Sequence, residues 1–127
     1  MNSNGIFISV FLLQYLWDRL TSSCVTNIGE FLLIFHHVMS VYLLIGGFLF
    51  NPKYHLLALL LTVIHWLFNY NKCFLTDWTN HYCGYDNGKP FQDIITKLKL
   101  REYISPNIHW YLIIILIIYD IKKICKL

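Results

Sequence analysis

The sequence predicts an all-α membrane helical bundle, with three to four transmembrane helices and one amphipathic helix at the membrane interface. Hydrophobic residues make up 57% of the 127 positions and charged residues 13%, and long apolar runs alternate with short polar stretches. Soluble domains are about 45–50% apolar, and a chain this short cannot hide the excess from water because its surface-to-volume ratio is high. We therefore expect a single membrane domain covering residues 1–127, with lipid as the solvent of its apolar faces.

Four apolar runs are the candidate spans, and they lie at about residues 5–20, 31–50, 52–70 and 106–124. The first run is short for a hydrocarbon core of ~30 Å, so a spanning helix and an interfacial helix remain alternatives for it. Asn51-Pro52 is typical of an N-cap followed by proline in the first helical turn, which makes the second and third runs a helical hairpin. Trp110 and Tyr111 suit a membrane interface at the start of the last run.

The polar segment between the third and fourth runs predicts the amphipathic helix, at about residues 90–104. After Pro90, apolar residues recur at i, i+3, i+4 and i+7, which is the pattern of one helical face. Lys97, Lys99 and Arg101 lie near this face, so the helix suits a membrane surface with anionic headgroups. Packing of the same face against the bundle is the alternative.

The net charge of +3 comes from basic residues spread between the apolar runs, unlike the clustered basic face of a nucleic-acid-binding protein. Six of the ten basic residues fall in the loops on one side of a four-span arrangement and four on the other. By the positive-inside rule, this difference leans towards a cytosolic loop at 71–105. The expected partners are the lipid bilayer and either other proteins or a second copy of the chain, and no nucleic acid.

Four cysteines occur without C-x-x-C spacing, and they are Cys24, Cys73, Cys83 and Cys125. In a cytosolic loop we expect cysteines to be free thiols. A disulfide between Cys73 and Cys83 is the alternative if their loop is lumenal.

Polar residues inside the predicted hairpin are the candidate functional residues. Two antiparallel helices place residues at equal depth when these are equally far from the turn, which pairs His37 with His65 and Ser40 with Thr62. His36 lies beside the first of these pairs. Polar groups in membrane helices normally face the bundle interior, so we expect a level polar ladder there. Its further members, on the same helical faces if the third helix continues past residue 70, are Glu30, Asn69, Cys73 and Thr76.

Three interpretations of the ladder compete. A structural hydrogen-bond network is the simplest, since polar side chains commonly hold membrane helices together. Axial ligation of a haem, or of another metal, by His36 or His37 together with His65 is the second, because facing imidazoles on two helices have the required arrangement. A proton or ion path through Glu30 and the histidines is the third. The chain contains no P-loop, nucleophile elbow, H-E-x-x-H or Rossmann pattern, so we expect no catalytic residue.

One stretch of the chain, at about residues 31–80, has a distinctive set of residues. These are His36 or His37, Gly46-Gly47, His65-Trp66, Asn69, Asn71-Lys72-Cys73 and Leu75-Thr76-Asp77. This stretch resembles a family of small, uncharacterised multi-pass helical membrane proteins found in bacteria and large DNA viruses, and Phe74 stands where bacterial members tend to have proline. The family has no assigned activity, so the resemblance implies a fold and not a reaction.

The hypothesis from the sequence is a non-enzymatic, multi-pass integral membrane protein with a structural or interaction role and no cofactor. Residues with AT-rich codons are abundant, and together with the resemblance they make a viral origin a further hypothesis. The alternative function is a haem- or metal-binding membrane redox protein that uses His36, His37 and His65.

Overall fold

The computed structural model describes residues 2–22, 24–84 and 94–126, and within them the protein is all-α, with no strands. This confirms the predicted secondary-structure class. The helices are α1 (Ser3–Thr21), α2 (Asn27–Leu49), α3 (Pro52–Phe68), α4 (Phe74–Cys83), α5 (Ile94–Lys97), α6 (Leu100–Tyr103) and α7 (Ile108–Cys125).

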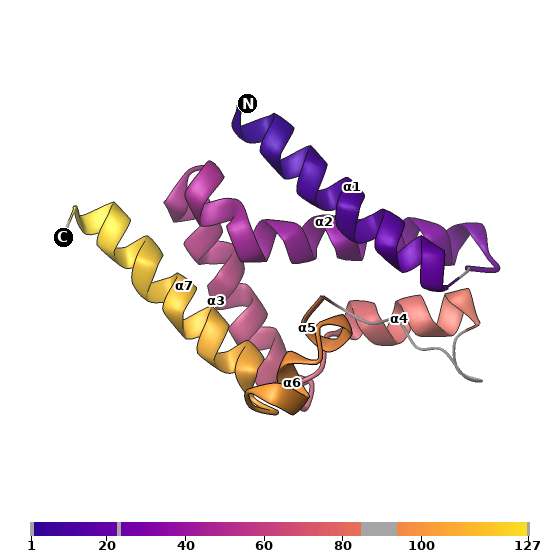
Figure 1. Ribbon diagram of the computed structural model, residues 1–127. Helices are drawn as coiled ribbons and strands as arrows, with labels where there is room; N and C mark the ends of the chain where they lie inside the picture. The colour runs from indigo at the N-terminus through magenta and orange to yellow at the C-terminus, as the bar shows by residue number, and fades with distance from the viewer. Residues whose placement is uncertain (1, 23, 85–93, 127) are drawn as a thin grey trace.

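The four long helices form two antiparallel pairs, α1 with α2 and α3 with α7 (Figure 1). The pairs meet at the α2–α3 turn and diverge from it, and α5 and α6 lie near the far end of α3. Phe7 packs against Phe50 with ring centroids 5.6 Å apart, so α1 begins near this turn. We call the part of the molecule around Asn51 the turn end.

The turn itself confirms the prediction from Asn51-Pro52. The Asn51 side chain accepts a 3.0 Å hydrogen bond from the backbone N–H of Lys53, and proline occupies the first turn of α3. Asn2 and Thr26 cap α1 and α2 in the same way, each accepting from a glycine N–H three residues later. These side chains satisfy N–H groups that a helix leaves without partners.

The amphipathic helix expected at about 90–104 differs in the structure. Residues 90–93 lie outside the described residues, and the remainder forms two short helices, α5 and α6, instead of one continuous helix. The break is at Lys99, whose backbone is left-handed with φ of 53°. That conformation interrupts the helical hydrogen-bond ladder and turns the chain between the two pieces.

Helix α4 lies along the first half of α2, and its end is fixed there by a disulfide between Cys24 and Cys83. The expectation of a free thiol is therefore wrong for these two cysteines, while Cys73 and Cys125 are free. Gly29 permits the close approach, because a Cβ at this position would lie 2.8 Å from the backbone carbonyl carbon of Tyr82. We call the region around this cross-link the disulfide end.

Charged side chains are buried in this fold beside aliphatic ones, while many large apolar side chains are exposed. Asp18 and Asp120 are only 2% and 0% exposed, whereas large apolar side chains cover the outer faces of the long helices. By length and composition, α2 could cross a membrane, and it alone meets both criteria among the described helices. Among the most exposed apolar side chains on the long helices are Leu13, Leu20, Phe31, Leu67 and Phe68.

Candidate functional site

A buried polar cluster joins α1 to α2 through Asp18 and His37. Nε2 of His37 lies 3.2 Å from Oδ2 of Asp18, and Nζ of Lys97, on α5, lies 2.5 Å from Oδ1 of the same carboxylate. The Gln14 amide nitrogen contacts Nδ1 of His37 at 2.9 Å and donates to Ser40 at 3.2 Å. The imidazole of His37 is thus held between the Gln14 amide and one oxygen of the Asp18 carboxylate, while Lys97 binds the other oxygen.

Glu30, at the N-terminal end of α2, also contacts α1. Its carboxylate lies 3.2 Å from the guanidinium of Arg19 and accepts a hydrogen bond from the hydroxyl of Tyr15. The Tyr15 ring in turn meets the His37 imidazole edge-on, with centroids 5.9 Å apart. The link between Glu30 and His37 that the shared helical face suggested therefore passes through the ring of Tyr15.

A second buried cluster joins α3 to α7 through His55 and Asp120, near the turn end. Nδ1 of His55 lies 2.6 Å from Oδ2 of Asp120, and Nε2 lies 3.1 Å from the carbonyl oxygen of Leu43. A carbonyl only accepts, so Nε2 carries a proton, and a further proton lies between Nδ1 and the carboxyl. The pair is therefore electrically neutral as a whole, whichever atom holds that shared proton.

Gly47 makes room for the second cluster. A Cβ at this position would lie 2.7 Å from Nδ1 of His55 and would also overlap Oδ1 of Asp120. The Gly47 carbonyl accepts a 2.7 Å hydrogen bond from Nζ of Lys123, which adds a second polar link between α2 and α7. The glycine lets α2 close directly onto the buried His–Asp pair.

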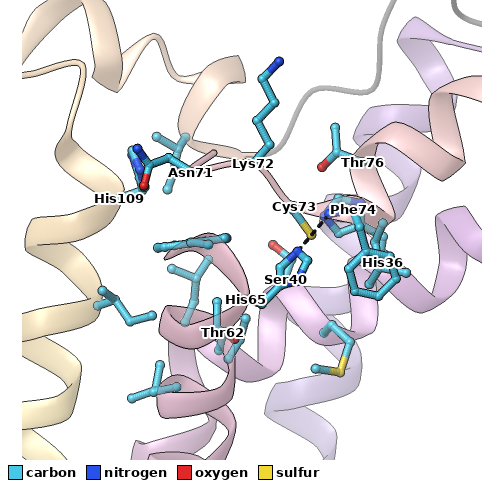
Figure 2. A pocket seen from close by; sticks show the side chains of 18 of the residues that line it. His36, Ser40, Thr62, His65, Asn71, Lys72, Cys73, Phe74, Thr76 and His109 are labelled. Atoms are coloured by element: carbon cyan, nitrogen blue, oxygen red, sulfur yellow. Dashed lines mark hydrogen bonds between the residues drawn. The ribbon is translucent and has the colours of Figure 1, made fainter. Parts of the chain in front are cut away.

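A cavity of about 660 Å³ lies between α2, α3, α4 and α7, with polar and apolar side chains in its wall (Figure 2). Nε2 of His65 accepts a 3.1 Å hydrogen bond from the backbone N–H of Phe74, which fixes the imidazole at the start of α4. Thr62 donates to its own helix, to the carbonyl of Ala58 at 2.9 Å. Six residues of the predicted site line this cavity: His36, Ser40, Thr62, His65, Cys73 and Thr76.

Of the adjacent histidines, His36 lines the cavity with His65, while His37 bonds to α1. Helix α3 ends at Phe68, and the next turn contains residues with positive φ. Cys73 therefore lies at the N-cap of α4 and Thr76 in its first turn, and neither continues a polar stripe of α3. Asn69 closes α3 by donating from its side chain to the carbonyl of Lys72 at 2.9 Å.

The predicted site did not include His55, Asp120 or Gln14, although all three interrupt apolar runs. A polar residue inside such a run needs a partner in lipid, and this signal could have marked each of the three. Lys97 was expected beside anionic headgroups and not beside a buried carboxylate. It carries no comparable signal, because it lies in a polar segment. Lys97 lies 79 positions from Asp18 in the sequence, and only the tertiary fold brings the two side chains together.

Within residues 2–22, 24–84 and 94–126, no group of three or more His, Cys, Asp or Glu side chains is arranged to hold a metal ion. The chain matches no family model, no curated protein and no solved structure. Function is therefore inferred from the buried clusters, the cavity and the outer surface.

Proposed function

We propose that the protein is a multi-pass integral membrane protein with a structural or interaction role, in which α1, α2, α3 and α7 lie in the bilayer. The burial of charged side chains together with the exposure of large apolar ones carries this proposal. His55 is 0% exposed beside Asp120, whereas Leu20 and Phe68 are 87% and 85% exposed. In water such a surface is an aggregation hazard. In lipid the same arrangement is favourable, because apolar faces meet hydrocarbon and polar groups meet one another.

The helix lengths are compatible with this location. At 1.5 Å per residue, α2 is about 34 Å long, and α1, α3 and α7 are about 28, 26 and 27 Å long. A hydrocarbon core is ~30 Å thick, so the three shorter helices need slight local thinning or polar residues that extend to the interface. Arg19 and Lys123, near the ends of α1 and α7, have side chains long enough for that purpose.

The two His–Asp clusters support a structural role for the buried polar groups. Asp18 with His37 joins α1 to α2, and His55 with Asp120 joins α3 to α7. Each group that would be expensive in lipid meets a partner on a neighbouring helix. Partnership with other proteins or a second copy, membership of the resembled family and a viral origin stay predictions.

The disulfide supports an orientation opposite to the one that the count of basic residues favoured. Disulfides persist in oxidising compartments, so we propose that the disulfide end faces such a compartment. The turn end then faces the cytosol, with Lys53 in the first turn of α3 and a basic C-terminal end of α7. This gives the cytosolic side Lys53, Lys122, Lys123 and Lys126, four basic residues against six on the other side, so the disulfide and the positive-inside count favour opposite orientations.

Alkaline carbonate extraction and one charged variant test the membrane location. We expect the protein to stay in the membrane pellet, and Ile114→Lys on the outer face of α7 to reduce its insertion, since a central Lys costs about 2.5–3.5 kcal/mol. Tyr103→Lys, at an exposed position outside the long helices, is the control and should insert normally. Release by carbonate, or better solubility of Ile114→Lys in detergent-free buffer, would contradict the proposal.

The haem alternative fits these residues poorly. His36 and His65 line one cavity, but Nε2 of His65 already uses its lone pair to accept from the N–H of Phe74. Iron ligation through that atom would need this hydrogen bond to break. An absorbance spectrum of the purified protein tests the alternative, and a Soret band that disappears in His36→Ala would restore it.

A further inference from the structure

The cavity has an aliphatic inner part and a polar outer part. From His36 to Leu44 its wall follows α2 for about 12 Å towards the turn end, at 1.5 Å per residue. Aliphatic side chains of α2, α3 and α7 line the inner part. They are Leu43, Leu44, Leu59, Leu112, Ile113 and Leu116.

Two hydrogen-bond donors in the outer part have no acceptor among the residues that the structure describes. Nε2 of His65 accepts from the backbone N–H of Phe74, so the proton of a neutral imidazole is on Nδ1. The Ser40 hydroxyl accepts from Gln14, which leaves its own proton to donate. Both side chains line the cavity, Ser40 from α2 and His65 from α3 (Figure 2). These donors suit a ligand with an accepting oxygen.

The charged residues of the outer part do not call for a charged ligand. Lys72 and Asp77 contribute one charge of each sign, and Arg101 has an interaction partner of its own. A charged headgroup would therefore lose part of its hydration here without gaining a counter-charge, which is costly. These residues suit an uncharged ligand.

We propose that the cavity binds one uncharged membrane lipid, whose carbonyl oxygen accepts hydrogen bonds from His65 and Ser40 and whose aliphatic chain fills the inner part. The volume of about 660 Å³ lies within the range of about 300–1,000 Å³ of small-molecule sites. Water has no polar partners in the aliphatic part and is not held there. A chain supplies the dispersion contacts that an empty space loses, and a carbonyl supplies the acceptor that the two donors lack.

Isoprenoid quinones and acylglycerols are the two kinds of bilayer molecule with this chemistry. Aromatic rings near the donors favour a quinone. The ring of Phe74 meets the His65 imidazole edge-on, with centroids 4.7 Å apart, and Trp66 lines the same cavity. A flat conjugated ring packs well against such rings. This inference rests on the proposed membrane location, because the bilayer supplies either molecule.

The experiment uses the full chain, delipidated in a non-ionic detergent, and two matched pairs of probes. Decylbenzoquinone and decylbenzene share a ring and a chain, but only the first has carbonyl oxygens. Monodecanoylglycerol and decanoate share a chain and a carbonyl, but only decanoate is charged. Equilibrium dialysis, with protein-free micelles as the blank, gives the stoichiometry and the dissociation constant of each probe.

We expect one molecule of decylbenzoquinone per chain, bound at least about fivefold more tightly than decylbenzene, since one hydrogen bond strengthens binding by about that factor. Monodecanoylglycerol should bind more tightly than decanoate. Of the two uncharged carbonyl probes, the one with the lower dissociation constant identifies the source of the ligand.

Substitutions of the donors test the carbonyl contact. Ser40→Ala and His65→Phe each remove one donor and should weaken binding of decylbenzoquinone about fivefold, with little effect on decylbenzene. Thr62→Val is the matched control on the same wall, because the Thr62 hydroxyl already donates to Ala58. If circular dichroism shows that His65→Phe is unfolded, Ser40→Ala carries the test.

Substitutions on α7 test the inner part. Leu112→Trp fills the aliphatic part and should abolish binding of decylbenzoquinone, while Ile114→Trp on the outer face of the same helix should retain it. Leu116→Phe replaces Leu112→Trp if circular dichroism shows that the latter is unfolded.

Three results would each overturn this inference. They are equal affinity of the unmodified chain for decylbenzoquinone and decylbenzene, tighter binding of decanoate than of monodecanoylglycerol, and unchanged quinone binding in a folded cavity-filling variant. Any of them in a protein that resists carbonate extraction would count against the lipid site alone. Release by carbonate would count against the membrane location itself.

Discussion

His55 on α3 and Asp120 on α7 are 65 positions apart in the chain, yet Nδ1 and Oδ2 approach to 2.6 Å, with neither side chain exposed. Oδ1 of Asp120 has no hydrogen-bond partner among the described residues. A full negative charge on Asp120 would therefore be poorly solvated, which agrees with a pair that shares one proton and is neutral overall.

Substitutions of Asp120 should separate a pair of two uncharged side chains from a pair of two charged ones. Asparagine can donate to Nδ1 of an uncharged His55 and keep the contact to Leu43, so we expect Asp120→Asn to lower the free energy of unfolding by only about 1 kcal/mol. Asp120→Ala leaves Nδ1 of a buried, uncharged imidazole without a partner and should lower it by about 2–3 kcal/mol. Unfolding in mixed detergent micelles, followed by circular dichroism, measures both. Equal losses would contradict a pair of uncharged side chains, and Asp77→Ala is the control.

A methyl group at Gly47 should destabilise the protein, although alanine is the better helix former. In an unobstructed helix, Gly→Ala gains roughly 0.5–1 kcal/mol. At position 47 the added Cβ meets both members of the His–Asp pair, so we expect Gly47→Ala to lose about 1–3 kcal/mol instead. Gly5→Ala, in the first turn of α1, is the comparison and should not lose stability. A stabilised Gly47→Ala in the same unfolding assay would contradict the close packing.

Lys97 should matter only while Asp18 is charged. Lys97→Gln leaves the buried carboxylate without its cation and should cost about 3–5 kcal/mol. Adding Asp18→Asn should restore part of that loss, giving a coupling energy between the two sites of at least about 1 kcal/mol in a double-mutant cycle. Additive effects would mean that the two groups do not interact. Lys99→Gln is the matched control on a neighbouring exposed lysine.

Thiol labelling should distinguish the cross-linked cysteines from the free ones and report the orientation. A maleimide mass tag should add to Cys73 and Cys125 in the denatured, unreduced protein, and to all four cysteines after reduction. In sealed vesicles with the oxidising face outward, an impermeant maleimide should reach Cys125 of a Cys73→Ser variant only after permeabilisation. Labelling of Cys125 in intact vesicles would reverse the orientation.

The sequence predicted how far each polar residue lies from the α2–α3 turn better than it predicted which neighbouring helix the side chain faces. Equal distance from Asn51 identified Ser40, Thr62 and His65, and all three line one cavity. The same rule paired His37 with His65, but His36 lines the cavity instead, because adjacent residues point about 100° apart around a helix of 3.6 residues per turn and equal depth does not give direction. The position of α1 decides between them, since it supplies Gln14 and Asp18 to His37.

Contacts between distant segments could not be predicted from spacing alone. Cys24 lies beside Cys83 because α4 packs antiparallel to the preceding chain direction along α2. The turn after α3 makes this reversal of the chain possible. Tyr70 and Asn71 both have positive φ there, a conformation that apolar periodicity does not reveal. The helix pattern past residue 70 therefore suggested a continuous stripe where the chain in fact reverses.

The His55–Asp120 contact also imposes an order on the biogenesis of the protein. The ribosome completes α3 before α7, so in the proposed membrane location His55 would enter the bilayer before Asp120 is made. Until α7 arrives, the α2–α3 hairpin would hold an imidazole without its carboxyl partner. A chain that stops before Asp120 is therefore expected to be a target for membrane quality control, whereas a chain that includes α7 buries both groups.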